Sequence, residues 1–147
     1  MRLSHNTLVV VADGRKSLFF RNEGDSEHPN LKVLEATEQS NPDHSDQATD
    51  LAGQPSSPQG SGRGTFQTVD YHQQEEDRFA AATADRLKSG ALQNEYDRLV
   101  IVAPPRTLGE LRKHYHGEVE KRIAGEIAKD LTGHPVDQIE KIIAAAD

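Results

Sequence analysis

The sequence predicts an α/β domain in which helices pack on a β-sheet. Two unbroken apolar runs, Leu8–Ala12 and Arg98–Ala103, have the length and β-branched content of buried strands. A helical pattern precedes the second run and another follows it, and this order is typical of crossover connections over a sheet. The chain has 147 residues, which is the size of one domain. We therefore assign residues 1–147 to a single folding unit.

The first third of the chain predicts an antiparallel meander. The run Leu8–Ala12 ends at Asp13-Gly14, a dipeptide that favours a tight hairpin turn, and residues 17–20 continue as a second strand. A third strand is expected at Leu31–Ala36, with Leu31, Val33 and Glu35 on one face and Lys32 and Leu34 on the other.

Residues 40–64 predict a long, exposed, flexible loop. This segment contains three prolines and four glycines, and Leu51 is its one large apolar residue. Loops of this length are either functional or mobile, and the sequence leaves both open. The loop ends in Gly62-Arg63-Gly64, which is either a plain linker or a tip where the backbone approaches a ligand and Arg63 supplies a cation.

Three helices are expected after this loop. A short extended piece at 66–69 precedes the first, which covers residues 73–87 and stops at Gly90. The second starts at a capping box, residues 107–110, and continues to about His116. The third follows Pro135 and closes the chain. Residues 118–131 fit both a helical and a strand period, with Gly125 favouring the strand.

The charge distribution argues against a broad phosphate-binding surface. Lysine and arginine number 17 against 24 acidic residues, so the formal net charge is −7. Residues 98–122 nevertheless carry six basic and three acidic residues, among them Arg106, Arg112 and Lys113. This segment is either a local basic face or a solvated helix surface.

Arg106 occupies a position that is suited to an anion. It follows the predicted strand 98–103 and Pro104-Pro105, at the point where the strand meets the start of a helix. Unpaired backbone amides and the helix dipole converge at such a crevice and favour negative charge. We therefore expect Arg106 to be a candidate anion or RNA contact.

The sequence offers no catalytic constellation and no metal site. Cysteine is absent, which excludes a disulfide framework and thiolate chemistry. Asp13 could bind a divalent metal, but no second carboxylate has a defined position beside it, and its place before glycine favours a turn. His114 and His116 are two residues apart and do not share a helical face. His72 near Glu75 is better explained as part of an acidic helix segment.

No apolar run approaches the length of a membrane span, and the first residues lack the apolar core of a secretory signal. We therefore expect a cytoplasmic protein without membrane insertion.

Five blocks of the sequence together carry a resemblance: residues 9–16 (VVVADGRK), 41–43 (NPD), 76–80 (EDRFA), 96–112 (YDRLVIVAPPRTLGELR) and 126–132 (EIAKDLT). These blocks resemble the bacterial host attachment protein family. That family is named for a role in bacterial attachment to host cells. It is distantly similar to the middle domain of archaeal and eukaryotic class-1 release factors and of Pelota, whose fold is RNase H-like. The resemblance implies an RNase H-like mixed sheet with flanking helices, in which residues 123–131 form a strand.

In release factors the loop before the long helix carries Gly-Gly-Gln, whose glutamine positions water for peptidyl-tRNA hydrolysis. The corresponding residues here are Gly62-Arg63-Gly64-Thr65-Phe66, so the catalytic glutamine is missing. The resemblance therefore implies at most a loop that contacts RNA or the ribosome.

Three hypotheses follow for function. The first is a cytoplasmic interaction protein without enzymatic activity or cofactor, which acts in host attachment through an unknown protein partner. The second is a ribosome- or tRNA-associated factor that uses Arg63, Arg106, Arg112 and Lys113. The third is a metal-dependent nuclease that depends on Asp13. The sequence leaves the oligomeric state open.

Overall fold

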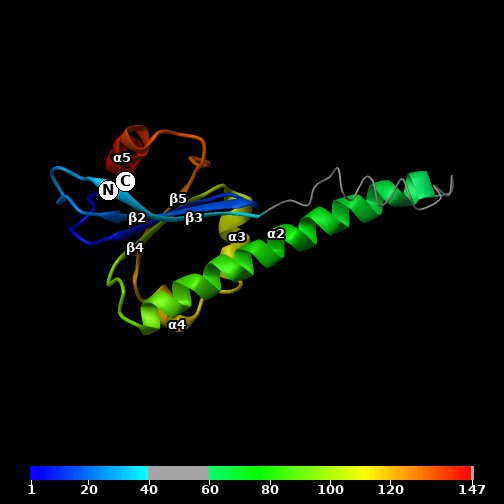
Figure 1. Ribbon diagram of the computed structural model, residues 1–147, viewed down its shortest axis with the longest axis horizontal. Coiled ribbons are helices and arrows are strands. Elements are labelled where there is room, and N and C mark those ends of the chain that lie inside the picture. The colour runs from blue at the N-terminus through cyan, green and yellow to red at the C-terminus, as the bar shows by residue number, and fades with distance from the viewer. Residues whose placement is uncertain (40–59, 147) are drawn as a thin grey trace.

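The computed structural model describes residues 1–39 and 60–146, with residues 60–70 described by their backbone. The chain forms a mixed sheet with helices on both faces (Figure 1). The strands are β1 (Leu8–Ala12), β2 (Lys16–Asn22), β3 (Leu31–Glu38), β4 (Leu99–Ala103) and β5 (Ile123–Ala128). The helices are α2 (Gly60–Leu92), α3 (Pro105–Arg112), α4 (Gly117–Glu120) and α5 (Val136–Ala145). The predicted fold class is confirmed.

The two apolar runs lie side by side in the centre of the sheet. The strand order is β3-β2-β1-β4-β5. Strand β1 pairs antiparallel with β2 and parallel with β4, with Val10 opposite Ile101. Strand β3 adds to β2 antiparallel, and β5 adds to β4 in parallel. The carboxyl ends of β1, β4 and β5 therefore share one edge of the sheet.

Both faces of the central strands are buried. Val10 and Ile101 pack toward the face covered by α2 and α3, whereas Val9 and Val100 pack toward α5 (Figure 1). All four side chains are at most 1% exposed. Full burial of such a side chain stabilises the fold by about 1.5–3 kcal/mol. Burial on two sides explains why these strands are apolar without alternation.

The hairpin between β1 and β2 turns at Asp13-Gly14, as predicted. One carboxylate oxygen of Asp13, Oδ1, accepts hydrogen bonds from the backbone N–H groups of Arg15 and Lys16, each at 2.7 Å. The Asp13 N–H in turn donates to the Lys16 carbonyl at 2.9 Å. Asp13 thus fixes the turn with its own side chain.

Helix α2 begins thirteen residues earlier than predicted. Residues 60–64 of the expected loop and the expected extended piece at 66–69 are helical, and residues 40–59 lie outside the described residues. Each glycine at 60, 62 and 64 costs a helix about 1 kcal/mol relative to alanine, which is why the sequence predicted a loop. Between Pro58 and the end of the helix there is no proline that would interrupt it. Because an established helix extends at low cost, the helix continues through the three glycines despite their low helix propensity.

Helix α2 also ends beyond the predicted stop at Gly90. The helix runs to Leu92, and the chain reverses at Asn94, whose φ is 57°. A side chain at Gly90 would bring a Cβ to 3.0 Å from Cε1 of Tyr96. Gly90 therefore leaves room for the Tyr96 ring to pack closely against α2 and does not end the helix.

The predicted capping box at residues 107–110 is wrong. Helix α3 starts at Pro105 with Pro104 as its N-cap, and no side chain caps it. Proline at the first helical position already has the required φ and lacks the N–H that would need a partner, which shifts the start upstream. The helix ends at Arg112, so His114 and His116 lie beyond it.

The ambiguous segment 118–131 contains both kinds of structure. Residues 117–120 form the single turn α4, and residues 123–128 form β5, which confirms the strand that the family resemblance implied over part of its expected length. Helix α5 follows Pro135 as predicted and buries Ile139 and Ile143 against the sheet.

Candidate functional site

Helix α2 projects past the carboxyl edge of the parallel strands. Its second half packs on the sheet through Phe79, Thr83 and Leu87, all at most 7% exposed. Its first half extends beyond the ends of the strands (Figure 1). The point of departure is marked by Gln73, whose Nε2 donates to Oε1 of Glu110 on α3 at 2.5 Å. Thirteen residues separate Gly60 from Gln73, so the projecting part is about 20 Å long.

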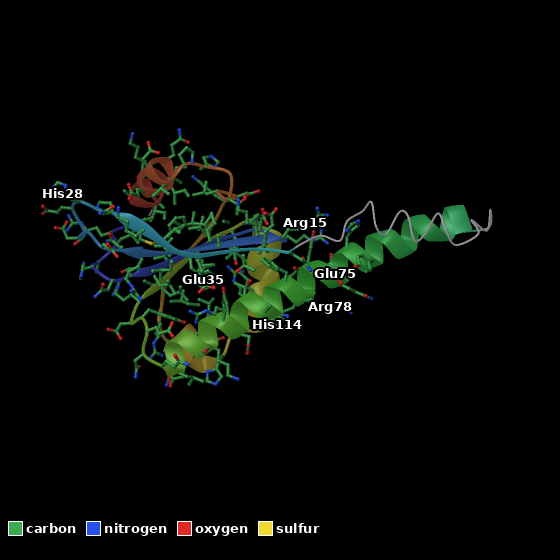
Figure 2. The ribbon with its side chains drawn as sticks, in the orientation of Figure 1. Arg15, His28, Glu35, Glu75, Arg78 and His114 are labelled. Atoms are coloured by element: carbon green, nitrogen blue, oxygen red, sulfur yellow. The ribbon has the colours of Figure 1, made fainter. Side chains whose placement is uncertain are left out.

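Polar contacts fasten the base of this projection. Figure 2 shows Glu75, Arg78 and His114 gathered where α2 leaves the sheet. Nε2 of Gln39, just after β3, donates to Oε2 of Glu75 at 2.8 Å. Nε2 of His114 lies 3.3 Å from Oδ1 of Asp77. Contacts from both the β3 side and the α3 side thus fix the direction of the helix.

Arg106 lies at this base, where the predicted crevice forms. Its side chain is 68% exposed, and its Nε lies 4.0 Å from Oε2 of Glu76 and 3.9 Å from Oε1 of Glu110. Both ion pairs are at the limit of contact distance, and exposed pairs of this kind stabilise a protein little. Arg106 is therefore accessible, but two carboxylates already reduce its attraction for an anion.

Glu110 is the site residue that the sequence interpretation missed. It was read as a capping residue, yet its side chain is 7% exposed and bonds to Gln73 across the α2–α3 contact. The spacing of Glu110 four residues after Arg106 was a signal for their pairing. Its bond to Gln73 had no local signal because the two residues are far apart in the chain.

Arg112 is directed toward β5. Its Nη2 lies 2.9 Å from Oε1 of Glu126, and its Nε lies 3.2 Å from the same oxygen. The hydrogen bonds to Glu126 raise the pKa of the Arg112 guanidinium. Burial raises the pKa of the neighbouring Tyr115 hydroxyl. Lys113 is exposed and makes no ion pair with the described residues.

The predicted basic face is largely neutralised. Three carboxylates from outside residues 98–122 reach basic groups within it: Glu76 and Asp77 from α2 and Glu126 from β5. Glu76 and Glu126 offset two of the three surplus positive charges of that segment, whereas Asp77 contacts His114, which is not counted among its cations. Arg122 is likewise paired with Glu118 at 3.2 Å. Lys113 is the candidate residue that keeps an unpaired charge within the described part of the chain.

The structure does not bring Arg63 and Arg106 together. Arg63 lies in the first turns of α2 with Gly62 and Gly64, at the outer end of the projection. Glu76, the α2 residue beside Arg106, is thirteen residues further along, which is about 20 Å on the helix axis. The candidate contacts thus form two separate places, the helix tip and the α3 face. Whether either binds an anion or RNA stays a prediction.

Asp13 has the structural role that the turn predicts. Its second oxygen, Oδ2, accepts a hydrogen bond of 2.9 Å from the Thr132 hydroxyl, so both carboxylate oxygens have partners. Across residues 1–39 and 71–146 no group of three or more histidine or acidic side chains is arranged to hold a metal ion. His114 and His116 also diverge, since Nδ1 of His116 accepts from the Glu118 N–H and caps α4.

Within the described residues, no helix has both the length and the apolar character of a membrane span.

Comparison with known proteins shows a match to one protein family. Residues 6–143 match the model of the family described as Bacterial archaeo-eukaryotic release factor family 12. The chain matches no curated protein. The match confirms the predicted resemblance to release factors, while the host attachment naming stays a prediction.

Proposed function

We propose, since the chain belongs to the bacterial archaeo-eukaryotic release factor family 12, that it is a cytoplasmic factor that contacts the ribosome or tRNA. The observation that carries this proposal is the projection of α2, which extends about 20 Å beyond Gln73. A rod of this length reaches a site that the body of the domain does not touch.

The outer end of α2 has features that suit RNA. It is the amino-terminal end of the helix, where unpaired backbone N–H groups and the dipole favour an anion such as phosphate. Arg63 adds a cation within the first turns of the helix. Because Gly-Gly-Gln is absent, we assign contact to this end and no hydrolysis of peptidyl-tRNA.

Co-sedimentation with ribosomes over a range of salt concentrations tests the proposal. We expect salt-sensitive binding, because neutralised phosphates release counterions. Arg63→Ala should weaken binding and lower the slope of log affinity against log salt by about 0.7–0.9, the value for one phosphate contact. Arg78→Ala is the control, since Arg78 is on the same helix and is 71% exposed, but lies at the base of the projection and is paired with Glu75 at 2.8 Å. Equal loss in both variants, or binding that ignores salt, contradicts the proposal.

The α3 face supplies a second comparison. Arg106 and Arg112 already contact carboxylates, so their replacement by alanine should change ribosome binding less than Arg63→Ala does. Lys113→Ala removes an unpaired charge and is expected to have the largest effect of the three. A dominant effect of Arg112→Ala would move the RNA contact from the tip to this face.

Attachment to host cells is the second candidate function, and the resemblance of the five sequence blocks favours it. In this reading the chain binds a protein partner in the cytoplasm and influences attachment indirectly. Affinity capture of the tagged full chain, from cells that attach and from cells that do not, tests it. A specific partner whose loss abolishes attachment supports this candidate, and normal attachment after deletion of the chain contradicts it.

A further inference from the structure

A polar groove opens at the edge of the sheet opposite the projection of α2. It encloses about 470 Å³ and lies at the amino-terminal ends of β1 and β4. Its walls are residues 5–7 before β1, residues 94–98 before β4, and Arg21 near the end of β2. Small-molecule sites typically have volumes of about 300–1,000 Å³. The proposed ribosome contact uses no residue of this groove.

Two arginines and two carboxylates line the groove, and their charges are not balanced. The Glu95 carboxylate is already paired, since its Oε1 lies 3.4 Å from Nη2 of Arg86. Arg98 and Asp97 are exposed and have no side-chain partner within the described residues. The Arg21 guanidinium makes one long hydrogen bond, 3.5 Å from Nη2 to the Glu95 carbonyl oxygen. Two available cations therefore face one available carboxylate.

The backbone of the groove is also unusual. Asn6 and Asn94 have φ values of 68° and 57°, and they are the two non-glycine residues with positive φ in the described ranges. Both line this groove. Asparagine adopts this left-handed conformation more readily than other non-glycine residues, and Asn94 does so just after the carboxyl end of α2. The Asn94 loop is held in place by Arg122, whose Nη2 donates to Oδ1 of Asn94 at 3.1 Å.

We propose that this groove binds a phosphate ester that carries sugar hydroxyls, which is the chemistry of a nucleotide. Arg21 and Arg98 bind the phosphate, because guanidinium groups present paired donors that match phosphate oxygens. The Asp97 carboxylate accepts hydrogen bonds from the sugar hydroxyls. Inorganic phosphate would bring a second negative charge close to the Asp97 carboxylate and would supply no sugar hydroxyl to bond to it. The Asp97 carboxylate therefore favours a ligand that has both a phosphate and sugar hydroxyl groups.

Isothermal titration of the full chain with each ribonucleoside 5′-monophosphate tests this proposal, with inorganic phosphate and the free nucleosides as partial ligands. We expect a mononucleotide to bind more tightly than either part. Arg98→Ala should weaken mononucleotide binding about tenfold, the loss expected for one charged hydrogen bond. Asp97→Asn should weaken the mononucleotide and leave the affinity for inorganic phosphate unchanged or increased.

Arg15→Ala is the matched control, because Arg15 is exposed and lies at the opposite end of the sheet (Figure 2). Circular dichroism verifies that each variant is folded. Competition with a short single-stranded RNA identifies the source of the ligand: displacement of the mononucleotide by RNA indicates a strand, and its failure indicates a free nucleotide. The proposal is overturned if the folded wild-type chain binds no mononucleotide, or if Arg98→Ala and Arg15→Ala bind it equally well.

Discussion

Replacing Asn22 by aspartate tests how one buried side chain holds the segment before β1 against the loop between β2 and β3. Asn22 is fully buried, and its side chain uses both of its hydrogen-bonding ends. Its Nδ2 donates to the carbonyl oxygens of Leu3 and Ser4 at 2.8 and 3.2 Å. Its Oδ1 accepts from the N–H groups of Gly24 and Asn30 at 3.0 and 2.8 Å. Aspartate has the same shape but cannot donate when it is ionised.

The expected cost follows from these bonds. Asn22→Asp keeps the two bonds that Oδ1 accepts and removes those that Nδ2 donates to Leu3, Ser4 and, at 3.5 Å, Asp25, which leaves three carbonyl oxygens facing a carboxylate. A buried polar group without its partner costs about 1–3 kcal/mol. We therefore expect the variant to lose about 3 kcal/mol of unfolding free energy at neutral pH, out of the roughly 5–15 kcal/mol typical of a domain.

Urea unfolding followed by circular dichroism measures this loss. The difference between wild type and Asn22→Asp should shrink at mildly acidic pH, because a protonated carboxyl is neutral and regains one donor. Asn30→Asp is the control, since the Asn30 residue is exposed and contributes its backbone N–H to the network. A loss below about 1 kcal/mol, the net value of a single hydrogen bond, would refute the reasoning, as would a loss that does not depend on pH.

Three further predictions concern the turn, the core and the projecting helix. Asp13→Ala removes three hydrogen bonds, two of 2.7 Å from backbone N–H groups and one of 2.9 Å from the Thr132 hydroxyl, and should cost about 2–3 kcal/mol in urea unfolding, while added Mg²⁺ leaves the midpoints of wild type and variant unchanged. Burial raises the pKa of the Tyr96 hydroxyl from 10.0 to about 12 and also raises the pKa of the Tyr115 hydroxyl, so an absorbance titration should show late-titrating tyrosines, of which Tyr96→Phe removes the one near pH 12. The neutral hydroxyl is the form that the fold favours, so its stabilising effect is complete below pH 10.0 and is lost as the pH rises toward 12. Gly64→Ala should stabilise α2 by about 1 kcal/mol and increase the helix content measured by circular dichroism. If the spectrum of Gly64→Ala is the same as that of the wild type, a helix that starts at Gly60 is contradicted.

The sheet could be predicted from the sequence because its signals are local. Strands β1 and β4 are continuous apolar runs, and the turn residue Asp13 lies between two strands that are adjacent in the chain. The start of α2 could not be predicted in the same way. Local preference at Gly60, Gly62 and Gly64 opposes a helix, and the continuation of the helix overrides it.

The charge state of the α3 face was beyond sequence analysis for a different reason. Arg112 contacts Glu126, fourteen residues away, and Arg106 contacts Glu76, thirty residues away. Only the packing of α2 and β5 around α3 brings these carboxylates close. Counting charges along a segment therefore overestimated how attractive this face is to phosphate.

The groove shows that counting charges along the sequence can also underestimate how attractive a site is to phosphate. Arg21 and Arg98 are more than seventy residues apart, and neither belongs to a recognisable motif. They converge because β1 lies between β2 and β4, and because β2 ends at the edge of the sheet where β4 begins. The topology thus gathers unpaired cations at one edge of the sheet, although the chain as a whole is acidic.

The two ends of the sheet differ in how many carboxylates a bound anion would have to displace from the arginines. At the α3 face a phosphate would compete with Glu76 and Glu110 for Arg106 and with Glu126 for Arg112. In the groove Arg98 has no carboxylate to give up, so binding there costs less. High salt should therefore weaken anion binding in the groove by screening the attraction between the anion and the arginines. At the α3 face, high salt also screens the ion pairs that Arg106 and Arg112 already make with carboxylates. Comparing the salt dependence of mononucleotide binding in Arg98→Ala and Arg112→Ala separates the two edges, because loss of a phosphate contact makes the dependence shallower. A shallower dependence in Arg112→Ala than in Arg98→Ala would place the anion at α3.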